Sequence, residues 1–542
     1  MVPITCASML RENLDDAGRL LRQVPGAGQE VVGLWVDLLR VGAGTSPIEP
    51  HPKDARFKDP TWRENAVYRA WAQGYLAWCA MADRITDRLD KAGVKQLPAL
   101  RFATGIATSA LAPTNFFWSN PAALKRAYET GGRSVVTGLT HWADDLVRNG
   151  AMPSQVKRGA FTVGHDLAVT PGAVIARDEV AEVIQYTPAP EKVREIPTLV
   201  VPPPIGRYYF LDLAPGRSFV EYAVSQELQT FMLSWRNPEK QHAAWGLDTY
   251  GQRVLSAIDE VRAATGAPKV NVIGFCAGGL VEATVLNRLA DTGDDAVNAA
   301  SFAVTLLDWR GPYPMNSFSN DAILGFARRL SKSKGVFGAK QMGSAFTWLR
   351  PDDLVWNYWV NNYLMGQDPP AFDILAWNAD GTRLPAALHS EFLDLFKTSP
   401  MAGRGEASYL GSPFDASKID VPVFVQGAVT DHLTPWQGTY RTTELVGSDD
   451  ITYVLSNAGH IASLVNPPSN PKASYFTGEG AGELDAPTWQ AQATKQSGSW
   501  WTEWTKWSAD HSGDLVDAPT ELGGGEPTLG AAPGAYVRDE VA

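Results

Sequence analysis

A cysteine at the centre of a glycine-rich turn is the first feature of this sequence that suggests chemistry. The stretch "VNVIGFCAGGLVEA" (270–283) is typical of a buried strand, a Gly-x-Cys-x-Gly turn around Cys276, and a helix. A strand-to-helix turn of this kind is crowded, so it needs small neighbours, and Gly274 and Gly278 provide them. The N-terminus of the following helix favours a thiolate. Cys276 is therefore a candidate nucleophile, although the motif alone also suits a purely structural turn.

Two further side chains stand in the order that such a nucleophile requires. Asp431 in "VTDHLTP" ends one predicted strand, and His460 in "NAGHI" ends the next. In α/β hydrolases the acid and then the histidine follow the nucleophile along the chain. Taken singly, Asp431 also suits a helix cap near Pro435, and His460 is one of eight histidines. Together with Cys276 they predict a Cys–Asp–His catalytic triad.

Backbone N–H groups near the nucleophile are expected to stabilise a developing oxyanion. The N–H of Ala277, directly after the nucleophile, is the expected first donor. We expect the second donor in "PPPIGRYY", the loop after the predicted strand "TLVVP", and assign it to Ile205, with Gly206 as the alternative. His432 directly follows Asp431, so the two side chains point in different directions. We interpret His432 as lining the pocket.

The elements that must position these residues predict an α/β-hydrolase fold. Over residues 186–542, apolar strands alternate with helices, as in "QTFMLSW" (229–235) before a helix at 246–265. Strands that are apolar along their whole length predict a mostly parallel sheet covered on both faces. A Trp- and Asn-rich interruption at about 312–415 is expected to be an inserted cap or lid.

The first part of the chain has a different character. A length of 542 residues exceeds what one core usually organises, so we expect a second domain. Residues 1–185 are predicted to be mainly helical, with apolar residues at helical spacing over 59–89 and a helix pair over 119–150 that breaks at Gly131 and Gly132. Near the end of this region, 173–188 alternates like paired antiparallel strands.

Composition excludes several classes of protein. A formal net charge of −12 and a pI near 5.3 argue against a nucleic-acid-binding protein. No apolar run is long enough for a transmembrane segment, and the N-terminus lacks the features of a signal peptide, so we expect a cytoplasmic protein. Three cysteines give no disulfide framework, and no Cys/His pair has zinc-site spacing. We expect neither a metal nor a cofactor.

Long segments of the chain resemble the polyhydroxyalkanoate synthases, which make storage polyesters from 3-hydroxyacyl-CoA. The resemblance covers nearly the whole chain, and its catalytic Cys, Asp and His fall on Cys276, Asp431 and His460. "GFCAGG" (274–279) is similar to the lipase-box variant of that family. The other similar segments are "FKDPTWREN" (57–65), "APTNFFWSNPAAL" (112–124), "LVVPPPIGRYYFLDLAPGRSFVEYAV" (199–224), "FMLSWRNP" (231–238), "LVWNYWVNNYLMG" (354–366), "DILAWNADGTRLP" (373–385), "DHLTPW" (431–436), "AGHIASLVNPP" (458–468) and "GSWWTEWTKW" (498–507).

The resemblance implies a class I-like, poly-3-hydroxybutyrate type of enzyme, with short-chain substrates such as 3-hydroxybutyryl-CoA. The segment "DILAWNADGTRLPAALHSEFLD" (373–394) also resembles the medium-chain class, so the length of the acyl side chain stays open. It also implies a homodimer formed through the cap region, a location at the surface of polyester granules, and a granule coat protein (a phasin) as partner. In place of the Asn-Lys-Tyr-Tyr common in the family, this chain has "GRYY" with Arg207. We assign substrate contacts to Phe275, His432, Trp377 and Trp436. Cap aromatics are expected to exclude water, with plain packing as the alternative for each: Trp356, Tyr358, Trp359 and Trp377.

Sulfur suits such a polymerisation because it exchanges one thioester for another, so the acyl group stays activated for the next alcohol. In the predicted reaction His460 activates Cys276, and later activates the attacking hydroxyl, while Asp431 orients the imidazole or acts on the hydroxyl directly. Two alternatives stay open. One is a cysteine-dependent hydrolase or depolymerase with the same triad, and the other is a non-catalytic granule protein that kept the fold.

Overall fold

The chain divides into two compact units. The computed structural model describes residues 27–92, 97–311, 313 and 321–539. The described residues of Met1–Lys157 and Ser344–Ala371 form one unit, which we call the helical unit. Those of Arg158–Gly343 and Phe372–Ala542 form the other, the α/β unit.

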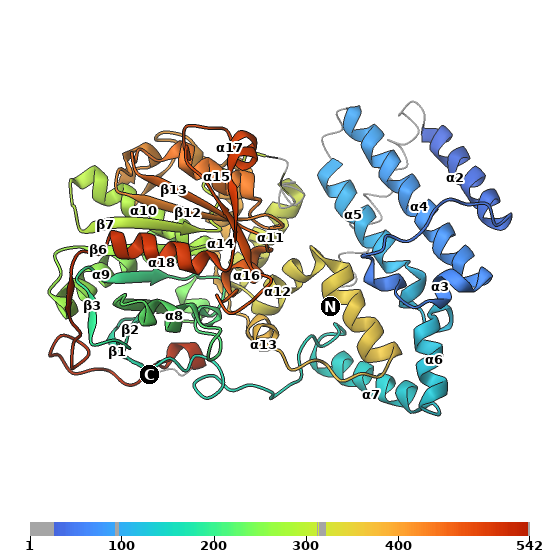
Figure 1. Ribbon diagram of the computed structural model, residues 1–542, viewed down its shortest axis with the longest axis horizontal. Helices are drawn as coiled ribbons and strands as arrows, with labels where there is room; N and C mark the ends of the chain where they lie inside the picture. The colour runs from blue at the N-terminus through green and yellow to red at the C-terminus, as the bar shows by residue number, and fades with distance from the viewer. Residues whose placement is uncertain (1–26, 93–96, 312, 314–320, 540–542) are drawn as a thin grey trace. The chain divides into compact units, whose positions relative to one another are not determined.

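A ten-stranded sheet organises the α/β unit (Figure 1). The strand order is β1-β2-β5-β4-β6-β7-β12-β13-β14-β15, and the six strands from β5 to β13 are parallel. The outer strands pair antiparallel. The strands are β1 (Gly172–Arg177), β2 (Ala181–Tyr186), β4 (Thr198–Val201), β5 (Thr230–Trp235), β6 (Val270–Phe275), β7 (Val297–Ala303), β12 (Val423–Ala428), β13 (Ile451–Ser456), β14 (Ser474–Thr477) and β15 (Thr494–Ser497). The predicted mostly parallel sheet is confirmed.

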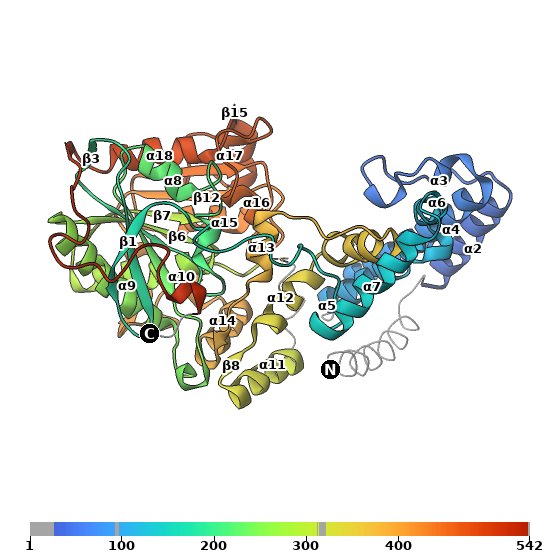
Figure 2. The same cartoon turned by 90° about the horizontal axis from the view of Figure 1, so that it is seen from below.

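Helices cover both faces of this sheet, which explains why its central strands are apolar throughout. Figure 2 shows α8 (Phe219–Ser225) and α18 (Trp500–Asp510) on one side of the strands, and α9 (Leu247–Thr265) and α10 (Ala277–Thr292) on the other. Successive residues of β6 point into different apolar clusters. Val272 packs with α9 and α10, and Ile273 packs with α8 and α18.

Shorter helices and strand pairs complete the part of the chain between residues 192 and 517. The helices are α11 (Asp321–Lys334), α12 (Ala339–Trp348), α13 (Asp373–Ala379), α14 (Ala386–Thr398), α15 (Trp436–Leu445), α16 (His460–Leu464) and α17 (Ala486–Gln492). Three small antiparallel pairs are β3 (Lys192–Arg194) with β16 (Leu515–Asp517), β8 (Val336–Phe337) with β9 (Leu384–Pro385), and β10 (Ser408–Tyr409) with β11 (Ser412–Pro413).

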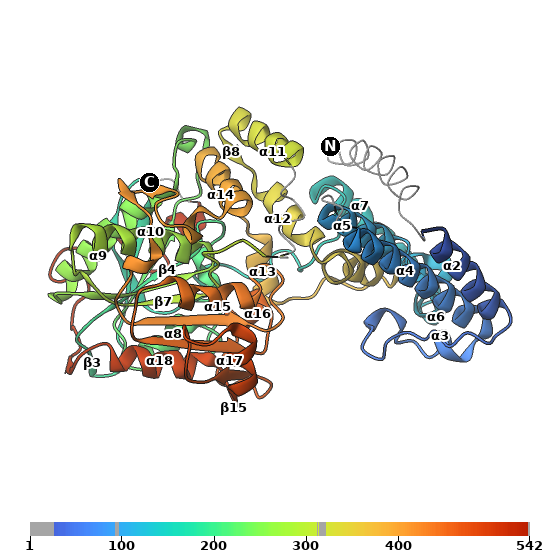
Figure 3. The ribbon, with the colours of Figure 1, turned by 90° about the horizontal axis from the view of Figure 1, so that it is seen from above.

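The helical unit is a bundle in which α2, α4 and α5 lie side by side (Figure 3). Its elements are α2 (Ala27–Gly42), α3 (Thr61–Glu64), α4 (Ala66–Lys91), α5 (Leu97–Ala110), α6 (Pro121–Glu129), α7 (Arg133–Arg148) and the π-helical segments η7 (Asp352–Trp356) and η8 (Trp359–Leu364). α4 begins after Asn65, whose side chain accepts hydrogen bonds from two N–H groups of its first turn. α7 approaches η8 so closely that a Cβ at Gly138 would lie 1.9 Å from the Tyr363 carbonyl oxygen.

The unit boundary differs from the predicted division at residue 185. β1 and β2 belong to the ten-stranded sheet, because β2 forms a hydrogen-bonded ladder with β5. The α/β unit therefore begins before these strands. The predicted cap, at about 312–415, is shared between the units, since Ser344–Ala371 groups with the helical unit and the rest of the described part with the α/β unit.

Candidate active site

Cys276 lies on the turn between β6 and α10, as the sequence predicted. It has φ 52° and ψ −119°, a backbone conformation that a side-chain-bearing residue rarely adopts. Small neighbours make the turn possible. A Cβ at Gly274 would lie 2.5 Å from the Gly279 Cα, and a Cβ at Gly278 would lie 2.1 Å from the Val201 carbonyl oxygen. The turn thus presents Cys276 at the N-terminus of α10, half-buried, with its backbone held in a strained conformation.

Asp431 and His460 come from the loops after β12 and β13, the two strands that follow β7 in the sheet. His460 Nδ1 lies 2.6 Å from Asp431 Oδ2, and both residues are buried. Cys276 interacts with the same ring, because its sulfur contributes to the raised pKa of His460. The structure therefore brings the three predicted residues together as one interacting row from three neighbouring loops.

Charges within this row shift the pKa of both ionisable partners. Burial acts to lower the pKa of His460, but the Asp431 carboxylate and the Cys276 sulfur act more strongly and raise it well above its ordinary value. Burial acts to raise the pKa of Asp431, yet the charge of His460 and hydrogen bonds from His460 and Thr434 bring it below its ordinary value. The arrangement favours a protonated His460 beside the Asp431 carboxylate. An imidazolium next to a cysteine is the kind of surrounding that activates a sulfur nucleophile.

Thr434 is a member of this site that the sequence did not single out. Its hydroxyl donates to Asp431 Oδ2 at 2.8 Å and lies 3.2 Å from His460 Nδ1. Backbone N–H groups of Leu433 and Thr434 donate to Asp431 Oδ1 at 2.8 and 2.9 Å. The sequence contains a signal for this contact, because an Asp followed by a Thr three residues later often forms such a hydrogen-bonded local turn. Thr434 fixes the carboxylate that in turn orients His460.

Comparison with known proteins shows the family to which this chain belongs. Residues 53–223 match the family described as the N-terminus of poly-beta-hydroxybutyrate polymerase (PhaC), and residues 214–467 match the alpha/beta hydrolase fold family. Poly(3-hydroxyalkanoate) polymerase 1 of Ectopseudomonas oleovorans is 42% identical over 96% of this chain and 92% of its own length.

This chain belongs to the poly(3-hydroxyalkanoate) polymerase family.

Further relatives of this polymerase come from other bacteria. The poly(3-hydroxyalkanoate) polymerase of Methylorubrum extorquens is 35% identical, with 97% of this chain and 88% of that protein covered. The poly(3-hydroxyalkanoate) polymerase subunit PhaC of Cupriavidus necator is 36% identical, with 90% and 83% covered. The predicted resemblance, the α/β-hydrolase fold and the prediction of an acyltransferase-type enzyme are confirmed.

The loop after β4 lies where the second oxyanion donor of the polymerase was predicted. Ile205 is half-buried in this loop, and Gly206 forms an antiparallel bridge with Gly381. Ala277 is the first residue of α10, so its N–H has no acceptor within the helix. The assignment of Ala277 and Ile205 as donors stays a prediction.

The four predicted substrate-contact residues have different surroundings. The Phe275 ring has no exposed surface and packs edge-to-face on Phe210 and Phe219, so in this conformation it supports the turn from within the core. Trp436 is 7% exposed and belongs to the core cluster on the α9 and α10 face. His432 is half-buried beside Asp431. Trp377, on α13, packs on Phe210 and donates its indole N–H to the Arg207 carbonyl oxygen at 2.7 Å.

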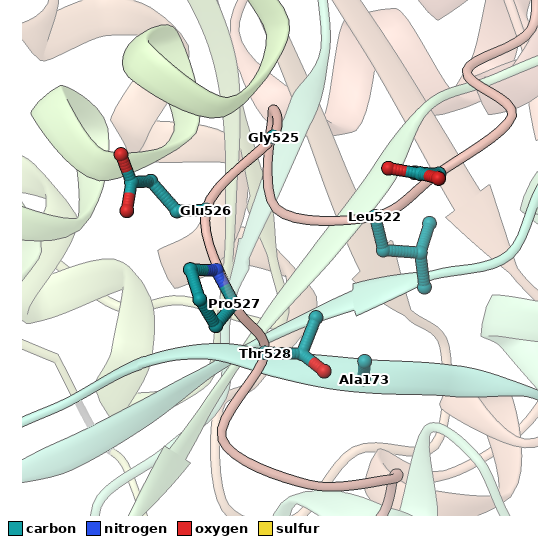
Figure 4. A pocket seen from close by; sticks show the side chains of 7 residues that line it. Ala173, Leu522, Gly525, Glu526, Pro527 and Thr528 are labelled. Atoms are coloured by element: carbon teal, nitrogen blue, oxygen red, sulfur yellow. The ribbon is translucent and has the colours of Figure 1, made fainter.

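The remaining expectations concern ligands and membranes. Among residues 27–92, 97–311, 313 and 321–539, no group of three or more His, Cys, Asp and Glu side chains is placed to hold a metal ion. In the same part of the chain no helix is both long and apolar enough to span a membrane. An open surface depression of about 460 Å³ lies between β1 and the segment 521–528 (Figure 4). Its lining includes none of the triad residues.

Proposed function

We propose that this polymerase joins 3-hydroxyacyl groups from 3-hydroxyacyl-CoA into a polyester and releases CoA, through acyl intermediates on Cys276. Short-chain substrates, with 3-hydroxybutyryl-CoA as the type, are part of the proposal. The observation that carries it is the juxtaposition of Cys276, His460 and Asp431, with His460 Nδ1 2.6 Å from Asp431 Oδ2, in a chain of this family.

The first step transfers the acyl group from CoA to the enzyme. The Cys276 sulfur attacks the thioester carbonyl, and the N–H groups of Ala277 and Ile205 stabilise the tetrahedral oxyanion. The C–S bond to CoA then breaks, and the CoA thiolate takes the proton held by the His460 imidazolium. The product is an acyl-cysteine, a thioester of nearly the same energy as the substrate.

The second step lengthens the chain. The hydroxyl group of another 3-hydroxyacyl unit attacks the acyl-cysteine carbonyl, and His460, now neutral, accepts the hydroxyl proton. A new ester bond forms as the bond to sulfur breaks, and Cys276 leaves as a thiolate. The 2.6 Å contact between Asp431 and His460 Nδ1 supports an orienting role for Asp431 rather than direct action on the hydroxyl.

Water must be kept from the acyl-cysteine, or hydrolysis would end the chain. Within the α/β unit, Trp377 supports this part of the proposal. Its ring packs on Phe210, and its indole N–H donates to the carbonyl oxygen of Arg207, which follows Ile205 and Gly206 in the same loop. Trp356 and Trp359 belong to the helical unit, where they pack against each other with ring centroids 5.8 Å apart. The cap function predicted for 312–415 remains part of the proposal.

We also propose that the protein attaches to polyester granules, binds a phasin and forms a homodimer. Apolar side chains on the surface of the helical unit support these proposals. On α2, Val32, Trp35 and Leu39 are 62%, 64% and 72% exposed, and on α7 Val147 is 82% exposed. Groups of exposed apolar residues commonly mark interaction surfaces.

A product assay tests the proposed function. Purified protein is incubated with 3-hydroxybutyryl-CoA, and CoA release and insoluble polymer are followed together, with 3-hydroxyoctanoyl-CoA as the comparison for chain length. We expect CoA release, polymer, and a higher kcat/KM for the shorter substrate. CoA release with only free 3-hydroxy acid would contradict the proposed polymerisation and support the hydrolase alternative. The names of the relatives do not favour that alternative.

A further inference from the structure

The turn at residues 535–539 is fixed by several hydrogen bonds to buried side chains. Tyr536 is 3% exposed, and its N–H and that of Ala535 donate to the fully buried carboxylate of Glu182 at 3.0 and 3.1 Å. Its hydroxyl accepts from Arg236 Nη2 at 2.7 Å, and the guanidinium of Arg236 lies over its ring at 4.4 Å. Charge-assisted hydrogen bonds of this kind are among the strongest in proteins.

Arg207 joins this turn to the loop after β4. It is 4% exposed, and its Nη1 donates to the Tyr536 carbonyl oxygen at 2.9 Å. Its Nη2 donates to Asp539 Oδ2 at 2.5 Å. Nε lies 3.5 Å from Asp380 Oδ1. A guanidinium buried between these acceptors has little freedom to move, so the backbone of residue 207 is fixed relative to the 535–539 turn.

The backbone of the same loop is held from a second direction. The Arg207 carbonyl oxygen accepts the Trp377 indole N–H, and Gly206 is bridged to Gly381. The Tyr209 hydroxyl donates to Asp380 Oδ2 at 2.9 Å. The loop that carries Ile205 is thus clamped between the 535–539 turn, through the Arg207 side chain, and the α13 region, through its backbone.

We infer that Arg207 is a positioning residue that, together with the 535–539 turn, fixes the second oxyanion donor of the active site. This inference rests on the proposed function, in which the Ile205 N–H faces the oxyanion. Because charge on that oxygen develops only in the transition state, misplacing the donor lowers kcat and leaves KM nearly unchanged.

The test compares two arginines that hold the same turn. Arg207→Met removes the link to the Ile205 loop, whereas Arg236→Met removes only a contact to Tyr536. CoA release from 3-hydroxybutyryl-CoA gives kcat and KM, and thermal unfolding gives Tm. We expect Arg207→Met to lower kcat roughly 10- to 100-fold with KM within about threefold, since one oxyanion donor is commonly worth roughly 10²- to 10³-fold. Arg236→Met loosens the turn but keeps the Arg207 contacts to it, so it should lower Tm and reduce kcat clearly less than Arg207→Met.

Two conservative variants keep the test decisive if Arg207→Met does not fold. Arg207→Lys keeps the charge but cannot bond both acceptors, and Asp539→Asn weakens one of the two bonds, so each should lower kcat less than Arg207→Met. Unchanged kcat in folded Arg207 variants, or an equal loss in Arg236→Met, would overturn the inference while wild-type activity upholds the proposed function. Absence of CoA release by the wild type would overturn both.

Discussion

In the α/β unit the large side chains Trp489, Trp500, Trp501 and Trp504 are at most 1% exposed, whereas in the helical unit Trp35 and Trp118 are 64% and 79% exposed. The α/β unit encloses its apolar side chains on both faces of one sheet and also holds Cys276, Asp431 and His460, of which the last two are buried. The helical unit has a smaller core, formed around Phe57 and Trp62. It keeps much apolar area on its surface.

This contrast separates two demands on the molecule. Chemistry needs a rigid, desolvated surrounding in which a few polar groups are held in register, and such surroundings require complete burial. Contact with a polymer or a partner protein needs apolar area that is available from solvent. We therefore expect substitutions in the α/β unit to alter turnover, and surface substitutions in the helical unit to alter association.

The largest expected effect comes from the two described cysteines, one in each unit. Cys276→Ala should lower CoA release by roughly 10⁴-fold or more, because no acyl-enzyme can form. Cys79→Ala, a half-buried position on α4, should keep full activity. Steady-state CoA release and mass spectrometry of the acylated enzyme check both variants. A Cys276→Ala protein that still makes polymer would break the assignment of chemistry to the α/β unit.

Buried carboxylates allow the next comparison. Asp431→Asn should lower kcat by roughly 10²- to 10⁴-fold, since it removes the anion that orients His460 and raises its pKa. Asp145 is a 3% exposed carboxylate of the helical unit that bonds to Ser154 and Tyr363.

Asp145→Asn is the matched control for Asp431→Asn. It should lower Tm through loss of its hydrogen bonds but leave kcat of the folded protein within about twofold. Activity assays at a temperature well below both unfolding transitions separate the two effects. Equal losses of kcat in the two variants would mean that the units are not functionally separate.

A third prediction concerns the pH dependence of stability in the α/β unit. Burial raises the pKa of Asp212 from 3.8 to about 6, against hydrogen bonds from Thr170 and Ser218 that lower it. The folded state therefore binds more protons than the unfolded state between these values, so stability falls as pH rises from about 4 to about 6 and then levels off. The total loss in the free energy of unfolding over this pH range is of order 3 kcal/mol.

Asp212→Asn should remove this dependence. As pH rises from 4.5 to 7.5, the variant should become more stable relative to the wild type. Differential scanning calorimetry measures this as an increase in the Tm of the variant minus the Tm of the wild type. Asp517→Asn, at a strongly exposed position, should show no such gain. A constant Tm difference between Asp212→Asn and the wild type across this range would contradict the assignment of the raised pKa to Asp212.

The smallest effect on turnover is expected on the surface of the helical unit. Trp35→Gln combined with Leu39→Gln should leave CoA release within about twofold and reduce binding to preformed polyester granules several-fold, because apolar area is lost. Leu529→Gln, 48% exposed in the α/β unit, is the control and should bind granules like the wild type. Co-sedimentation with granules measures the difference. Unchanged sedimentation of the double variant would place the granule contact elsewhere.

Much of the α/β unit followed from the sequence because its determinants are local. The Gly274, Cys276 and Gly278 pattern specifies a crowded turn whichever way the rest folds, and uniformly apolar strands imply a sheet covered on both faces. The order of Cys276, Asp431 and His460 then predicted the triad, and the structure places these three residues together. The boundary at 185 was misplaced because β1 and β2 are antiparallel edge strands, whose membership in the large sheet depends on pairing with β5.

Spatial neighbours far apart in sequence decided the rest. Phe275 looked like a pocket residue beside the nucleophile, but strand alternation and the rings of Phe210 and Phe219 place it in the core. Arg207 gave no sign of its partners, since the Tyr536 carbonyl oxygen that it bonds is 329 residues away. The sequence by itself determined which groups we propose for the chemistry, because local sterics and chain order encode them. Only the tertiary structure decided which groups hold them in place, because those contacts form between segments that meet only on folding.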